Sequence, residues 1–152
     1  MKFIDNETIS IYSDIEPKPC SRTTMPYMTE DEIKDIQKKP FLNKRSVNFY
    51  IKYNNKTYNL FIPKGYTWDG ASIPFGFRWI LGGKGNPSFL IPSMVHDEMC
   101  ENKHLIDNNR KLSSIIFYNL LLACQCSKLK AKIMYLAVDN YQKLAKGWKK
   151  DE

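Results

Sequence analysis

The sequence has few of the residues from which disulfide scaffolds and histidine-rich metal sites are built. It contains four cysteines and two histidines among 152 residues. Four cysteines do not make a disulfide framework at this length, and the pair Cys124 and Cys126 has C-x-C spacing instead of the C-x₂-C spacing common in zinc sites. We therefore expect reduced thiols with structural roles.

Long hydrophobic runs are also missing. The longest uncharged stretch of the C-terminal half, residues 112–127, is shorter than the ~20 residues that a membrane-spanning helix needs, and it contains several polar residues. The N-terminus carries acidic residues at positions 5 and 7 and no apolar block, which is not typical of a secretory signal. We expect a soluble, cytoplasmic protein that does not span a membrane.

The chain does have enough apolar residues for one core. Hydrophobic residues make up 43% of the sequence and aromatic residues 13%, which excludes wholesale disorder. The formal net charge is +7, but acidic residues outnumber basic ones in residues 1–40, whereas basic residues dominate residues 101–152. The basic half indicates a solvated, Lys-rich helix face, with nucleic-acid binding as the alternative.

The N-terminal region has the pattern of an arm. The first 28 residues contain three prolines, which discourage helix, and we expect them to be extended or irregular. Thr29 and Glu32 have the spacing of a capping box, which predicts a short helix that ends at the next proline. We assign residues 1–40 to an N-terminal arm and residues 41–152 to a single globular domain, and expect the domain to fold without the arm.

The remaining sequence predicts an α+β fold. Alternating apolar and polar residues from Val47, the pair Asn54 and Asn55, and a second strand from Thr57 indicate a β-hairpin. Apolar residues at three- and four-residue spacing then indicate helices over residues 88–101, 109–124 and 127–147, after one or two helical turns at 75–81. The predicted architecture is a small antiparallel hairpin or sheet packed on a three-helix unit, with the N-terminal arm attached.

Two patches contain the residue types that carry chemistry. One is the loop at residues 65–74, which reads GYTWDGASIP, and the other is His96-Asp97 within a predicted helix. Apolar residues flank His96, so its ring nitrogens need hydrogen-bond partners, or burial costs about 1–3 kcal/mol. The candidate partners are Asp69 and Ser72 of the loop or a side chain of the central helix. We expect the loop to pack on the helix that carries His96.

These residues support two interpretations. In the structural one, Asp69 accepts backbone N–H groups of its loop, and His96 fixes that loop to the helix. In the catalytic one, His96 is a general base, Asp97 or Asp69 orients it or holds a cation, and Ser72 belongs to the same site. Asp97 is the candidate ligand for a divalent cation, and the sequence identifies no other cofactor.

The two patches together resemble a bacteriophage and prophage family, the domain of unknown function DUF1353. Its pattern is an aromatic loop that ends in Asp-x-Ala-Ser-Ile-Pro, then His-Asp in a helix, then Met-Tyr-x-Ala-Val, which residues 134–138 match. The resemblance covers residues 45–148 and implies a phage or prophage source, in the host cytoplasm or the virion, without a known activity. Its signature residues are Asp69, Ser72, Pro74, His96 and Asp97.

One position departs from the family pattern. Members carry an acidic residue three positions before a phenylalanine of the next helix, where this sequence has Ser114 before Phe117. His96, Asp97 and Cys100 also match a helix of secreted phospholipases A2, in which an aspartate of a second helix orients the histidine. Ser114 stands where that aspartate is expected, and no calcium loop is recognisable, so this likeness rests on one helix.

Three functions are compatible with these features. The one we favour is a phage-encoded accessory or virion-associated protein that binds a phage or host protein and catalyses nothing. The first alternative is a small hydrolase with His96 as general base, and the second is nucleic-acid binding through the basic C-terminal helix. The sequence leaves the substrate, the partner and the oligomeric state open.

Overall fold

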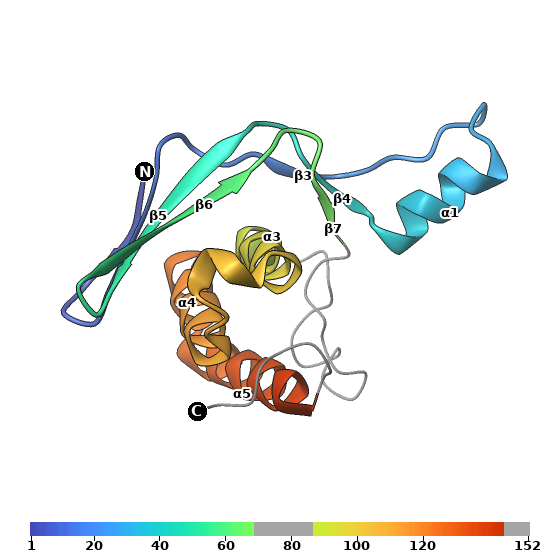
Figure 1. The fold of residues 1–152 in the computed structure, drawn as a ribbon. Helices are drawn as coiled ribbons and strands as arrows, with labels where there is room; N and C mark the ends of the chain where they lie inside the picture. The colour runs from blue at the N-terminus through green and yellow to red at the C-terminus, as the bar shows by residue number, and fades with distance from the viewer. Residues whose placement is uncertain (69–86, 145–152) are drawn as a thin grey trace.

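The computed structural model describes residues 1–68 and 87–144, and its architecture is α+β, as predicted (Figure 1). Its strands are β1 (Lys2–Asp5), β2 (Ile9–Ser13), β3 (Pro19–Ser21), β4 (Phe41–Asn43), β5 (Val47–Tyr53), β6 (Lys56–Ile62) and β7 (Thr67–Trp68). Its helices are α1 (Glu30–Lys38), α3 (Pro87–Glu101), α4 (Arg110–Ala123) and α5 (Lys128–Leu144), with a 3-10 turn, η2 (Lys103–Ile106), between α3 and α4.

The main sheet has antiparallel strands in the order β1-β2-β5-β6. The predicted hairpin forms β5 and β6, and Asn54 and Asn55 make its turn with φ angles of 48° and 61°. Asparagine tolerates this left-handed backbone better than most residues do. Alternate residues of both strands face the core, so that Phe49, Ile51 and Leu60 are fully buried. Strands β3, β4 and β7 form a second, smaller sheet.

The N-terminal strands correct the prediction for the first 28 residues, which are not an irregular arm. β2 pairs with the central strand β5, with Ile11 opposite Ile51, and both Ile9 and Ile11 are buried. The core therefore extends across residue 40. Alternating isoleucines are a strand signal, and the prolines that argued against regular structure all follow β2 in the sequence.

Residues 22–40 form an insertion that leaves the body between β3 and β4. The two strands pair in antiparallel fashion, and the backbone N–H of Arg22 donates to the carbonyl of Pro40 at 2.7 Å, which closes the neck of the insertion. The predicted cap of α1 is present, because the N–H of Glu32 donates to the Thr29 hydroxyl at 3.2 Å. Figure 1 shows α1 standing apart from the other helices.

Replacement of residues 23–39 by an Asn-Gly turn is expected to leave a cooperative melt with little change in Tm. The neck already holds the ends of β3 and β4 side by side, and Asn-Gly suits a two-residue hairpin turn. Deletion of residues 1–21 is expected to abolish cooperative unfolding, because it removes β2 and its buried isoleucines, for which truncation to alanine alone costs about 2–5 kcal/mol each. Thermal melts followed by circular dichroism check both, and loss of the melt on the loop replacement would place the insertion in the core.

The three-helix unit lies on one side of the main sheet (Figure 1). α3 contacts β6, α4 contacts β1, and α5 packs on α4. One hydrophobic cluster joins the sheet to α3 and α4, and a second joins Phe89 of α3 to α4 and α5. In the part of the chain that the structure describes, no helix has the length and hydropathy of a membrane span.

Candidate functional site

His96 lies on α3 in the apolar environment that the sequence predicted. The ring of Phe117, on α4, lies with its centroid 5.0 Å from that of the imidazole. The sulfur of Cys100, one helical turn along α3, is 3.8 Å from both ring nitrogens. Burial lowers the pKa of His96 to about 4, so the ring is neutral at physiological pH.

The hydrogen-bond partner of His96 is Gln142 on α5. The amide nitrogen of Gln142 lies 2.9 Å from Nε2 of His96 and donates to it. A neutral imidazole has one nitrogen that accepts and one that carries a hydrogen, so this bond places the hydrogen on Nδ1. The bond therefore occupies the lone pair through which His96 would act as a general base.

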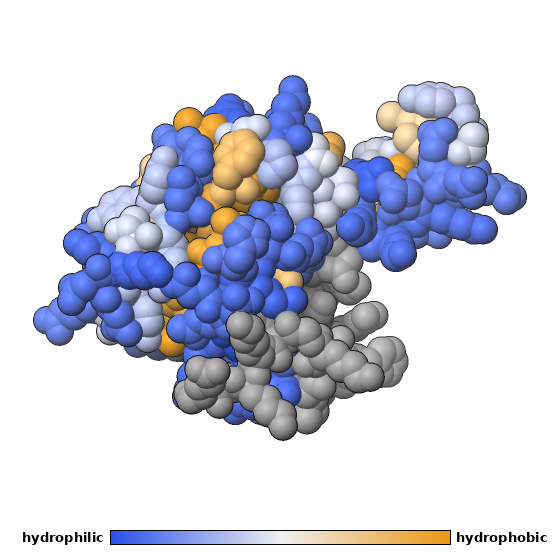
Figure 2. Space-filling model, in the orientation of Figure 1, coloured by the Kyte–Doolittle hydropathy of each residue, from blue (hydrophilic) through white to orange (hydrophobic). Residues whose placement is uncertain are grey.

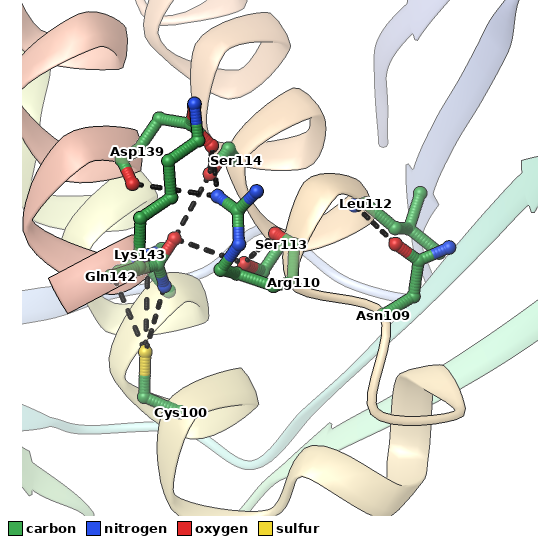
Figure 3. Close-up of polar contacts among 10 residues, drawn as sticks. Cys100, Asn109, Arg110, Leu112, Ser113, Ser114, Asp139, Gln142 and Lys143 are labelled. Atoms are coloured by element: carbon green, nitrogen blue, oxygen red, sulfur yellow. Dashed lines mark hydrogen bonds and ion pairs between the residues drawn. The ribbon is translucent and has the colours of Figure 1, made fainter. Parts of the chain in front are cut away.

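A chain of buried polar side chains continues from Gln142 to an ion pair (Figure 3). The Ser114 hydroxyl on α4 lies 2.9 Å from Gln142 Oε1 and 3.0 Å from Asp139 Oδ1, and donates its single proton to one or the other. Asp139 in turn forms an ion pair with Arg110, and both residues are buried. The hydroxyl of Ser113 donates to the carbonyl of Arg110 at 2.6 Å. The network connects α3, α4 and α5.

Asp139 is the charged centre of this network. Burial opposes its ionisation, but hydrogen bonds from Arg110 and Ser114, together with the nearby Lys143 at 3.4 Å, hold the pKa of Asp139 below its usual value. The carboxylate is therefore ionised at neutral pH and faces a buried guanidinium. Removal of either partner alone is expected to destabilise the fold, because it leaves the other charge in the interior without its counter-charge.

Cys100 beside His96 lacks the properties of a nucleophile. Burial, followed by the negative charge of Asp97, raises the pKa of its thiol to about 12. A cysteine attacks as the thiolate, which such a pKa suppresses at neutral pH. All four cysteines are free, as predicted. The pair His96 and Cys100 therefore does not form an activated thiol.

A second buried polar region surrounds Tyr66 and the acidic residues of α3. The hydroxyl of Tyr66 is buried, and its pKa is raised, first by burial and then by the charges of Glu101, Asp97 and Glu98. Glu98 is buried and accepts from Asn102 at 3.0 Å, and burial raises its pKa. Within residues 1–68 and 87–144, no group of three or more His, Cys, Asp or Glu side chains is arranged to hold a metal ion.

The predicted site residues fall on both sides of the described boundary. His96 and Asp97 lie on α3, and the role of Asp97 as a cation ligand stays a prediction. Asp69, Ser72 and Pro74 lie outside the described residues, as do the packing of their loop on α3 and the helical turns expected at 75–81.

Sequence reasoning missed the residues of α5 that complete the network. It identified Ser114 as standing where an acidic residue was expected, and the structure supplies a carboxylate beside it from Asp139. Asp139 and Gln142 are three residues apart and therefore share one face of the helix. Within α5, Asp139 is the only acidic residue, which was the available signal.

The insertion presents the most exposed aromatic side chain among the described residues. Tyr27 is 82% exposed and Met25, two residues earlier, is 43% exposed. The first turn of α1 adds exposed acidic residues, Glu30, Asp31 and Glu32. Figure 2 shows this part of the molecule standing off from the body, with apolar side chains next to hydrophilic ones. The first turn of α1 thus places a local cluster of negative charge close to exposed apolar side chains.

The outer face of α5 has the opposite charge. Leu129 is 72% exposed and Leu136, two turns along, is 48% exposed. Lys132 lies between them, and Lys143 extends the same face. Positions at three-, four- and seven-residue spacing share one side of a helix, so these side chains form a stripe about 21 Å long. We call these four residues the α5 stripe.

These features define a class of protein: a small α+β fold whose three helices are tied together by a buried polar network at His96. The chain matches the family model "Protein of unknown function (DUF1353)" over residues 46–138, and it belongs to this family, as the sequence motifs predicted. The match includes β5, β6, α3 and α4 and begins after the insertion.

A curated protein is similar to the chain over part of its length. The chain is 38% identical over 80 residues to "Uncharacterized protein y4jT" of Sinorhizobium fredii (strain NBRC 101917 / NGR234). That stretch is 53% of this chain and 23% of the relative, so the likeness covers under a quarter of the relative's length. No solved structure matches the chain.

Proposed function

We propose that this chain is a phage-encoded accessory or virion-associated protein that binds a protein partner through its insertion and catalyses no reaction. The proposal rests on the insertion, which projects from the body (Figure 1) and carries Tyr27, whose side chain is 82% exposed. A large aromatic side chain on a protruding segment is typical of the anchors that dominate protein interfaces. The phage origin rests on the motif resemblance.

The construction of the insertion supports this role. Its neck is closed by β3 and β4, α1 is capped by Thr29, and Arg22 pairs with Asp35 at 2.9 Å. Segments that are ordered before binding lose less conformational entropy on association.

The geometry around His96 supports a structural role for that residue. His96, on α3, accepts a hydrogen bond from Gln142 of α5 and packs against Phe117 of α4, so it lies at the junction of the three helices. The hydrolase alternative draws support from a different observation, the chain of polar groups that joins His96 to a buried carboxylate. A hydrolase would need a free lone pair on His96 to accept a proton, and the hydrogen bond from Gln142 occupies the lone pair of Nε2.

A photo-crosslinking experiment tests the proposal. With p-benzoylphenylalanine in place of Tyr27, irradiation in the cells that produce the native protein is expected to yield a discrete crosslinked protein. The Tyr27→Ala variant is then expected to bind that purified partner at least about tenfold more weakly, a loss of ~1.4 kcal/mol.

Tyr50 provides the matched control. It is a partly exposed aromatic residue on the outer face of β5, remote from the insertion in the fold. The same probe at Tyr50 is expected to give no such product. Equal yields from both positions, or undiminished binding by Tyr27→Ala, would contradict a role of the insertion in partner binding.

A further inference from the structure

We infer that the insertion of one molecule docks on the α5 stripe of a second copy of this chain. This inference rests on the proposed function and specifies the partner. Both surfaces are present on every copy, each is exposed, and each supplies what the other lacks.

The charges of the two surfaces are complementary. Residues 22–40 carry four acidic and four basic side chains, but three of the acidic ones, Glu30, Asp31 and Glu32, form an exposed cluster in the first turn of α1. α5 carries four lysines, and its single acidic residue, Asp139, is buried with Arg110. Complementary surface charges steer two proteins together and fix their relative orientation.

The apolar groups of the two surfaces are complementary as well. Tyr27 and Leu129 are the two most exposed large hydrophobic side chains in the described ranges. Leu129 and Leu136 are separated by two helical turns, about 10 Å, which leaves a space between them wide enough for an aromatic ring. Burial of Tyr27 between the two leucines would remove the largest apolar exposures of both surfaces together.

The fold keeps the two surfaces of one molecule apart. α1 projects from one end of the molecule, and α5 lies at the far side of the three-helix unit (Figure 1). A contact between the insertion and the α5 stripe is therefore made between copies. If two copies exchange insertions reciprocally, the contact closes into a two-fold dimer, and if each copy binds a different neighbour, it repeats into open chains or rings.

Sedimentation velocity of the full chain over a range of concentrations tests the inference. The wild type is expected to form dimers or larger species whose share rises with concentration and falls with added salt. Two double charge reversals are each expected to weaken association at least about tenfold. One is Glu30→Lys with Asp31→Lys on the insertion, and the other is Lys132→Glu of the stripe with Lys128→Glu, an exposed lysine directly before Leu129. The reversal Lys64→Glu with Lys111→Glu, at exposed positions outside both surfaces, is the matched control for the α5 variant and is expected to leave association unchanged.

Mixing the two reversed proteins separates the inference from general electrostatic effects. Each is expected to be monomeric alone, and the mixture is expected to associate, because the native insertion of one meets the native stripe of the other. Circular dichroism melts establish that each variant is folded before it is used.

Three results would overturn the inference: a wild type that is monomeric at every concentration, association that survives both reversals, or association that nuclease treatment abolishes. A monomeric wild type whose Tyr27 probe still crosslinks a different protein would refute self-docking and leave the proposed function standing. Failure of that crosslink as well would refute both.

Discussion

Asp139→Ala is expected to lower the free energy of unfolding by about 3–5 kcal/mol. The substitution removes the carboxylate that faces the buried guanidinium of Arg110 and takes an acceptor from Ser114. It also breaks the link between α4 and α5, since both of these contacts cross that helix pair. Urea unfolding at neutral pH, followed by circular dichroism, measures the loss.

Two variants control this experiment. Lys143 approaches the same carboxylate from the exposed side, so Lys143→Ala is expected to cost less than about 1 kcal/mol. The double variant Arg110→Met with Asp139→Leu removes both charges and is expected to recover most of the stability that Asp139→Ala loses. If Asp139→Ala proves no more destabilising than Lys143→Ala, the buried network does not hold the helices together.

Acidification from neutral pH is expected to destabilise the protein through His96 by about 3 kcal/mol. Burial lowers the pKa of His96 from 6.5 to about 4 in the folded state. Between pH 6.5 and 4, His96 is therefore mostly protonated in the unfolded chain and mostly neutral in the folded protein. The contribution of the neutral ring is complete above pH 6.5 and is lost as the pH falls toward 4.

The variant His96→Asn isolates this effect from the titration of other groups. Burial raises the pKa of Glu98, so its protonation on acidification has the opposite effect on stability, and both proteins share that contribution. The difference between the wild-type and variant curves therefore reports on His96. The variant is expected to lose less stability between pH 6.5 and 4. Parallel stability curves for wild type and variant would mean that His96 binds its proton as readily in the folded protein as in the unfolded chain.

The same residue tests the structural interpretation at neutral pH. His96→Ala is expected to cost about 1–3 kcal/mol, because it leaves a cavity against Phe117 and removes the acceptor of Gln142. A hydrolytic activity that His96→Asn abolished while the fold remained intact would instead favour the catalytic alternative.

Much of the local structure could be predicted because its causes are local. The turn at Asn54 and Asn55 follows from the tolerance of asparagine for positive φ, and the start of α1 follows from Thr29 three residues before Glu32. The helices of the C-terminal half follow from apolar spacing. The strand β2 was missed, because its central position depends on pairing with β5, about forty residues further along the chain.

The candidate site was predictable only in part. An imidazole in an apolar helix needs a partner whatever the fold, and the sequence identified His96 on that ground. Its partner, Gln142, is 46 residues away, and no local pattern relates the two positions. Sequence reasoning named Asp69 and Ser72 of the loop, which lie outside the described residues, or a side chain of the central helix as candidate partners. The hydrogen bond that the structure describes comes from α5.

The sequence by itself determined the fold class, the hairpin, the cap of the inserted helix and membership of the family, since each depends on neighbouring residues or on a linear motif. Only the tertiary structure decided that β1 and β2 belong to the main sheet. It also decided that residues 22–40 form an insertion that projects from the body between β3 and β4. It also placed the carboxylate of Asp139 within hydrogen-bond distance of Ser114, the position where the family pattern has an acidic residue. The physical reason is common to these cases: contacts between residues far apart in sequence depend on how strands pair and helices pack, and side-chain volume and chain connectivity across the whole domain set that packing.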